Sequence, residues 1–159
     1  MLESSLCLNL QTNTVKKHIV ILNGPNLNLV GIRQPEIYGV ESFDTFIPYL
    51  KEKYFQTVIT YHQSNHEGVL IDWLHQYGFT VDGILLNAGG YTHTSIALAD
   101  AIKSITTSVI EVHLSNIYER EPYRHQSYLK EVCVNTIYGK GMKGYEEAVD
   151  YFLNDSNFL

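Results

Sequence analysis

The sequence is poor in the features that mark secreted, membrane-spanning or zinc-binding proteins. Its 159 residues include only two cysteines, Cys7 and Cys133, which lie far apart and form no CxxC pair. Neither a disulfide framework nor a thiolate zinc site is therefore indicated. No apolar run approaches the roughly 20 residues of a membrane span, and residues 1–17 lack the basic start and long apolar centre of a signal peptide. We therefore expect a protein of the reducing cytoplasm.

Positive charge is also scarce. Eleven Lys and Arg residues stand against 17 Asp and Glu residues, which gives a formal net charge of −6. A field of this sign does not attract nucleic acid or an anionic membrane, so neither is expected as a partner. A local cluster of arginines could still bind a small anion.

Several motifs that define common enzyme classes are missing. The chain contains no GxGxxG, no Walker A sequence and no GxSxG, so interpretations as a dinucleotide-binding protein, an NTPase or a serine hydrolase lack their defining parts. His62 and His66 have the separation of a helical metal pair, but HExxH is absent. A metal site is therefore not expected.

What the sequence does contain fits one α/β domain. With 45% hydrophobic residues the chain has enough apolar material for a core. We expect residues 1–17 to be a loosely ordered extension and residues 18–159 to form a single catalytic domain. Five apolar, β-branched runs predict strands at residues 19–22, 58–61, 83–86, 109–114 and 132–138.

Helix-length segments alternate with these runs. The first predicted helix covers residues 43–54 after a Ser42 cap, and the second runs from a cap at Ser64 or Asn65 to a left-handed Gly78. The third runs from a cap at Thr94 or Ser95 through Lys103, and two more are predicted at residues 122–130, where the signal is short, and at 145–153. Alternating strands and helices imply a mostly parallel sheet covered on both faces. The predicted fold is a flavodoxin-like three-layer sandwich with a five-stranded parallel sheet, which binds ligands at the carboxyl ends of its strands.

Polar residues follow three of these strands. The loop at residues 23–39 is too long for an ordinary turn and is rich in Asn and Gly. The loop at 87–95 contains small residues that let a ligand approach backbone N–H groups, and it leads into a helix start, which favours an anion. Glu111 and His113 lie two apart in the fourth strand and so point to one side, where the carboxylate can orient a protonated imidazole for acid catalysis. Arg120 and Arg124 follow and can clamp a carboxylate.

Two other functions use the same features. A non-catalytic flavodoxin-like module could bind FMN or a small anion through the Asn and Gly loops, and purified protein carrying FMN would be yellow. A metal hydrolase could use His62, His66 and His93, and would be sensitive to chelators.

Taken together, six ordered blocks resemble the type II 3-dehydroquinate dehydratases, over about residues 18 to 152. They are residues 23–28 (NGPNLN), 33–39 (RQPEIYG), 63–68 (QSNHEG), 87–95 (NAGGYTHTS), 111–116 (EVHLSN) and 124–129 (RHQSYL).

The resemblance implies a lyase of the shikimate or quinate pathway that dehydrates 3-dehydroquinate to 3-dehydroshikimate through an enolate. By this resemblance Tyr38 is the general base, Arg33 stabilises its tyrosinate form, and Asn26 helps to hold the water and charge at the enolate. His113 is the general acid and Glu111 orients it.

The resemblance also assigns the substrate contacts and the assembly. It implies that Asn87, His93, Leu114, Ser115 and Arg124 contact the substrate, and that Asp100 reaches the site of a neighbouring subunit. No cofactor or metal is implied, and the expected assembly is a homododecamer built of trimers.

Overall fold

The computed structural model describes residues 16–32, 35–38 and 40–154 of the chain, and the part it describes contains a five-stranded parallel sheet. The strands are β1 (His18–Asn23), β2 (Val58–Gln63), β3 (Gly83–Asn87), β4 (Val109–Val112) and β5 (Asn135–Ile137). All five predicted strands are present. The bounds differ most at β4 and β5, which are shorter than the predicted runs.

The strand order is β2-β1-β3-β4-β5, with every neighbouring pair parallel. The chain first moves outward from β1 to β2 and then crosses back over β1 to β3. The strand order therefore reverses at β1 and β3, and the crevice beyond their carboxyl ends is where open sheets of this kind bind ligands. The predicted flavodoxin-like arrangement is confirmed.

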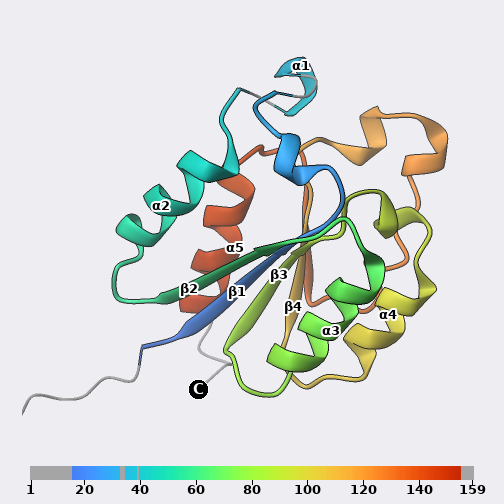
Figure 1. Ribbon diagram of the computed structural model, residues 1–159. Coiled ribbons are helices and arrows are strands. Elements are labelled where there is room, and N and C mark those ends of the chain that lie inside the picture. Colours follow the sequence, from blue (N-terminus) through green and yellow to red (C-terminus); the bar gives the residue numbers. More distant parts are fainter. Residues whose placement is uncertain (1–15, 33–34, 39, 155–159) are drawn as a thin grey trace, which may run out of the picture.

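Helices cover both faces of the sheet (Figure 1). The helices α2 (Phe43–Lys53) and α5 (Lys143–Asn154) lie on one face, and α3 (Glu67–Tyr77) and α4 (Ile96–Lys103) lie on the other. Side chains alternate between two buried clusters along β1: Ile19 and Ile21 pack beneath α2 and α5, whereas Val20 and Leu22 pack beneath α3 and α4. This alternation follows from the two-residue period of a strand.

The predicted cap of α4 is confirmed, and that of α3 is wrong. The Ser95 side chain accepts a hydrogen bond from the backbone N–H of Leu98. At α3 the N-cap residue is His66 rather than Ser64 or Asn65. The hydroxyl of Ser64 instead accepts the N–H of His66 at 3.0 Å, which closes a turn just before the helix.

Gly78 corrects a second prediction. It stands at the end of α3 with φ −63° and ψ −3°, so it is not left-handed. A Cβ atom there would lie 2.3 Å from Ile105 Cγ2 and 2.5 Å from the carbonyl oxygen of Leu74. Glycine is needed at this position because the chain after α4 packs directly on the end of α3, rather than because of the backbone angle.

The helix predicted at residues 122–130 is also wrong. One 3-10 turn, Pro122–Arg124, stands at the start of this range, and another, Ile117–Glu119, precedes it. Beyond them the hydroxyl of Ser127 accepts the backbone N–H groups of Leu129 and Lys130. A serine that binds nearby backbone N–H groups in this way competes with helix continuation.

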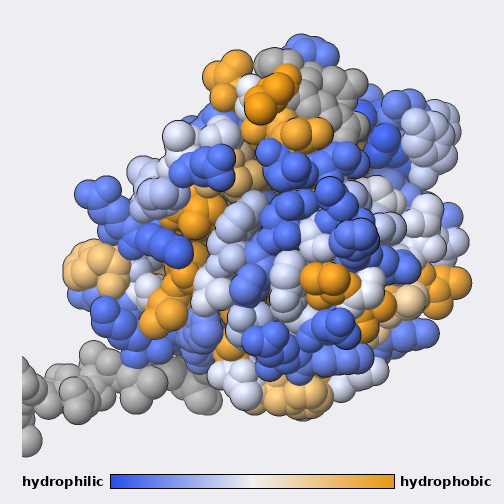
Figure 2. Space-filling view, viewed as in Figure 1, coloured by the Kyte–Doolittle hydropathy of each residue, from blue (hydrophilic) through white to orange (hydrophobic). Residues whose placement is uncertain are grey.

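Exposed apolar side chains are scattered over the molecule, and Figure 2 shows separate orange patches at the top, beside α1 (Pro35–Tyr38), and lower on the same face. On either side of this helix Ile32 is 80% exposed and Val40 is 81% exposed. In the described part of the chain no helix is long and apolar enough to cross a membrane. The predicted extension at residues 1–17 lies almost wholly outside the described residues, and β1 begins directly after it at His18.

Candidate active site

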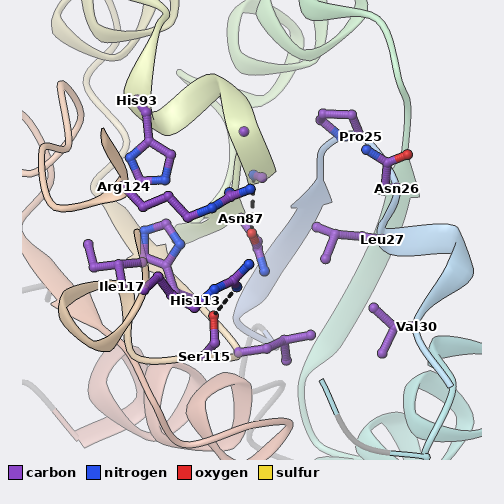
Figure 3. A pocket seen from close by; sticks show the side chains of 14 residues that line it. Pro25, Asn26, Leu27, Val30, Asn87, His93, His113, Ser115, Ile117 and Arg124 are labelled. Atoms are coloured by element: carbon purple, nitrogen blue, oxygen red, sulfur yellow. Dashed lines mark hydrogen bonds between the residues drawn. The ribbon is translucent and has the colours of Figure 1, made fainter. Parts of the chain in front are cut away.

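A pocket of about 130 Å³ opens at the carboxyl ends of β1, β3 and β4. In Figure 3 the side chains of His93, His113 and Arg124 gather on one side of it, opposite Leu27 and Val30. Seven residues predicted from the sequence to form the site line this pocket: Asn26, Asn87, His93, His113, Leu114, Ser115 and Arg124.

Close packing between two loops forms one wall of the pocket. Gly24 follows β1, and its N–H donates to the carbonyl of Asn87 at 2.7 Å. A Cβ atom on Gly24 would lie 2.6 Å from the carbonyl carbon and oxygen of Ala88. Only glycine therefore lets the loop after β1 lie against the loop after β3, and Asn26 comes two residues later with a left-handed φ of 67°.

Glu111 and His113 form a buried pair behind this wall. Glu111 lies in β4 and is fully buried, and its Oε1 lies 2.9 Å from Nε2 of His113. The backbone N–H of His113 donates to the carbonyl of Ile137 in β5, which fixes the residue at the strand end. A carboxylate can only accept, so Nε2 carries a proton. The ring, which lines the pocket, therefore has Nδ1 to offer to a ligand.

Glu111 is held in its charged form. Burial alone would raise the pKa of this carboxyl group, but the hydrogen bond and charge of His113 and the hydroxyls of Ser127 and Thr92 outweigh it and lower the pKa below its ordinary value. Thr136 adds a longer contact, 3.3 Å from its hydroxyl to Oε2. A charged Glu111 can only accept from His113, which fixes the orientation of the imidazole ring.

His93 has a different state. Its Nδ1 donates to the carbonyl of Gln126 at 2.6 Å, and its ring lies nearly parallel to that of His113, with 6.5 Å between centroids. Burial lowers the pKa of His93, and the nearby charges of His113 and Arg124 lower it further. The hydrogen bond to the carbonyl of Gln126 raises this pKa but does not outweigh the burial. A neutral ring with its proton on Nδ1 leaves Nε2 as an acceptor for a ligand hydroxyl.

Two arginines lie at the rim. Arg124 donates from Nε to a carboxylate oxygen of Glu121 at 2.9 Å and lines the pocket. Arg120 also lines it and donates from Nη1 to the Ser115 hydroxyl at 3.2 Å. The sequence indicates Arg120 as a possible anion clamp, but it is not among the predicted site residues. Its position four residues before Arg124, in the same segment after a strand, is the signal that could have placed it there.

Asn87 is oriented by a buried network that the sequence does not reveal. Its Nδ2 donates to the hydroxyl of Tyr145 at 3.0 Å, and its Oδ1 accepts the N–H of Gly89 at 3.2 Å. The Tyr145 hydroxyl in turn donates to Oδ1 of Asn23 at 2.7 Å. Tyr145 comes from α5, more than 50 residues along the chain, and nothing in its local sequence marks it for this role.

Three predicted residues are not brought into the pocket by the described structure. Arg33 lies outside the described residues, and of Tyr38 the structure describes only the backbone, at the end of α1. Asp100 lies on α4 with 67% of its side chain exposed, and its Oδ1 is 3.6 Å from Nζ of Lys103. It does not line the pocket of its own chain, and its action on a neighbouring subunit stays a prediction.

Comparison with known proteins identifies the family. The family profile described as Dehydroquinase class II matches residues 17–153. The 3-dehydroquinate dehydratase of Dinoroseobacter shibae is 49% identical over 136 residues, which cover 84% of this chain and 90% of that protein. For the enzyme of the same name from Bacillus licheniformis the identity is 47% over 146 residues, covering 88% of this chain and 98% of that protein.

A solved structure agrees with these sequence matches. The crystal structure of type II dehydroquinase from Butyrivibrio crossotus superposes with a TM-score of 0.83 at 41% identity, covering 87% of this chain and 99% of that one. The similarity thus extends over nearly all of the relatives' length, and the family profile spans every strand and helix described above except the last residue of α5. This chain belongs to the class II dehydroquinase family.

Proposed function

We propose that this chain dehydrates 3-dehydroquinate through an enolate in the pocket described above, with Tyr38 as general base and His113 as general acid. The chain is a 3-dehydroquinate dehydratase by family, an enzyme of the shikimate or quinate pathway. The observation that carries the proposed mechanism is the buried Glu111–His113 pair behind the pocket wall, at 2.9 Å.

The acid half of the mechanism uses this pair. The charged carboxylate of Glu111 accepts from Nε2 of His113, so the second proton of the imidazolium form lies on Nδ1. That proton passes to the C1 hydroxyl of the substrate as its C–O bond breaks, and water leaves. Removing a proton donor of this kind from an enzyme typically costs a factor of about 10² to 10⁴ in rate.

Binding and orientation come from the polar groups at the rim. The guanidinium of Arg124 and the hydroxyl of Ser115 provide a charged and donating end for a carboxylate. Neutral His93 accepts from a ring hydroxyl through Nε2. Asn87 and the segment at Leu114 contribute the remaining contacts to the substrate.

The base half requires tyrosinate. Free tyrosine has a pKa of about 10, so populating its anion near pH 7 requires the pKa to fall by about three units, which corresponds to roughly 4 kcal/mol. A single exposed ion pair contributes less than about 1 kcal/mol. We assign the shift to two guanidiniums, those of Arg33 and Arg120, acting where water is excluded.

The electrons and protons balance in this scheme. Tyrosinate of Tyr38 takes the C2 proton, and the C–H electron pair becomes the enolate, with its charge on the C3 oxygen. Asn26 helps to hold a water molecule and that charge. The enolate then re-forms the carbonyl, the C1–O bond breaks, and His113 supplies the proton that makes the leaving group water.

The proposal includes the assembly. We propose a homododecamer of trimers in the cytoplasm, in which Asp100 of one subunit completes the pocket of the next. Support comes from the position of Asp100, which lies exposed on the outer side of α4 and away from its own pocket.

The two other functions fit the geometry less well. A pocket of about 130 Å³ falls short of the roughly 300 Å³ at which pockets for drug-sized ligands begin, so it suits a small polar molecule better than FMN. In the part of the chain described, no three His, Cys, Asp or Glu residues are grouped to hold a metal. His62, a ligand in the hydrolase hypothesis, instead stacks on Trp73 and contacts the Tyr77 hydroxyl at 2.7 Å.

The direct test is addition of 3-dehydroquinate to the purified protein, with turnover followed by the ultraviolet absorbance of the conjugated product. Tyr38→Phe should remove nearly all turnover and leave substrate affinity within a few-fold, because only the proton-accepting oxygen is lost. Tyr49→Phe, an exposed tyrosine on α2, is the matched control and should behave as wild type. Turnover retained in Tyr38→Phe would mean that another group is the base.

A further inference from the structure

Ser127 makes the shortest contact to the buried carboxylate, 2.7 Å from its hydroxyl to Oε1 of Glu111. The same oxygen also accepts from the Thr92 hydroxyl and from Nε2 of His113, both at 2.9 Å. Three donors therefore converge on one oxygen. A proton on that oxygen would displace one of them, so Oε1 acts only as an acceptor.

The hydroxyl of Ser127 cannot turn away from Glu111. Its oxygen accepts the backbone N–H of Leu129 and that of Lys130, each at 3.1 Å. Both lone pairs are thus occupied, and the single hydroxyl hydrogen is left to point at the carboxylate. For the hydroxyls of Thr92 and Thr136 the described residues include no such pair of backbone donors.

Ser127 also lies in the segment that holds the substrate-binding groups. The preceding residue, Gln126, accepts from His93 through its carbonyl, and the following residue, Tyr128, donates its N–H to the carbonyl of Thr92 at 2.9 Å. Arg124 lies three residues before Ser127 in the same segment. One hydroxyl therefore joins the Glu111–His113 pair to the groups that orient the substrate.

We propose that Ser127 is a positioning residue, which holds Glu111 as an obligate acceptor for His113 and ties this acid pair to the segment that carries Arg124 and Gln126. It touches neither the substrate nor the reacting atoms. It acts on catalysis through Glu111 and on binding through the backbone on either side. This inference rests on the proposed role of His113 as general acid.

Ser127→Ala should lower kcat by about tenfold or more, since a hydrogen bond to a charged group is lost. It should also raise KM, because the segment that carries Arg124 and Gln126 is no longer tied to Glu111. Ser127→Thr restores the hydroxyl and should return both values to within about threefold of wild type.

Ser64→Ala is the control for the loss of a turn. The Ser64 hydroxyl accepts the N–H of His66, and the Ser127 hydroxyl accepts the N–H of Leu129, so each closes a turn with the residue two positions later. The Ser64 hydroxyl, unlike that of Ser127, does not contact Glu111. Ser64→Ala should lower Tm and leave kcat within about threefold of wild type. A purely structural role for Ser127 would give the same pattern in Ser127→Ala.

A double variant tests the route through Glu111. In the Glu111→Gln background there is no charge to hold, so adding Ser127→Ala should lower kcat by less than about threefold while KM still rises. An equal fall in kcat in both backgrounds, or a kcat of Ser127→Ala within about threefold of wild type, overturns the inference. Failure of the proposed function is separate: it would appear as full turnover in a His113 variant that is otherwise intact.

Discussion

Replacing Glu111 by Gln removes the charge of the acid pair and keeps its shape. The side chain is fully buried, and Oε1 accepts three hydrogen bonds of 2.7 to 2.9 Å. A glutamine can place its carbonyl oxygen at that position and turn its NH₂ group toward the hydroxyl of Thr136. We therefore expect Glu111→Gln to fold, whereas Glu111→Ala would leave a cavity and several donors without an acceptor.

The expected loss of stability follows from those three bonds. Hydrogen bonds to charged groups contribute about 1.5–3 kcal/mol each, against about 0.5–1.5 kcal/mol for neutral ones, so roughly 1 kcal/mol is lost per bond. The amide recovers part of this because it does not carry the cost of burying a charge. The net change in the free energy of unfolding is about 1–3 kcal/mol, which lowers Tm by roughly 3–10 °C for a chain of this length.

The loss should depend on pH. The donors around Glu111 lower its pKa in the folded protein although burial opposes them. The stabilisation is therefore fully present above the unfolded pKa of about 4.3 and is lost as pH falls through the lower folded value. The difference in stability between wild type and Glu111→Gln should accordingly shrink below about pH 4.

Catalysis should suffer more than stability. Without the carboxylate, the imidazolium that donates the proton loses its charged hydrogen-bond partner, so kcat should fall by about 10² to 10⁴. KM should stay within a few-fold because the amide still supports the ring. Turnover is measured by the absorbance of the conjugated product, and stability by thermal melts at several pH values. A folded variant with kcat within about threefold of wild type would refute this reasoning. So would a difference in unfolding free energy between wild type and Glu111→Gln that does not change with pH.

Three further predictions concern packing, chemistry and assembly. Gly78→Ala should lower the free energy of unfolding by about 1–3 kcal/mol, because its Cβ would lie 2.3 Å from Ile105. The control Gly68→Ala has open space around the new Cβ and should be neutral or stabilising by up to about 1 kcal/mol. Equal effects of the two variants in thermal melts would contradict this. Exhaustive chelation, and borohydride with substrate present, should leave activity intact, and covalent trapping of substrate on a lysine would refute the enolate route. Tyr38→Phe and Asp100→Ala subunits, each nearly inactive, should recover activity at about a quarter of sites when mixed in a cyclic trimer; no recovery would mean that Asp100 serves its own chain.

Much of the fold could be predicted because its signals are local. Apolar β-branched runs mark all five strands, and their alternation with helices requires a parallel sheet. The carboxyl-end rule then places Asn87 and His113 at one edge of that sheet from the sequence alone. The two-residue spacing of Glu111 and His113 is likewise a local signal for a pair on one side of a strand.

What could not be predicted depends on contacts between distant segments. Gly78 looks like a left-handed cap in sequence, but the requirement for glycine comes from Ile105, 27 residues away. Residues 122–130 have helical spacing, yet Ser127 binds nearby backbone N–H groups and a remote carboxylate instead. The role of Tyr145 depends on hydrogen bonds to Asn23 and Asn87, which no local pattern encodes.

The most direct test of the central claim is the kcat of His113→Asn on 3-dehydroquinate, measured beside His75→Asn, an exposed histidine on α3. If His113 protonates the departing hydroxyl, kcat should fall by at least about 10² while KM stays within a few-fold and the control behaves as wild type. Wild-type turnover in a correctly folded His113→Asn protein would contradict the account.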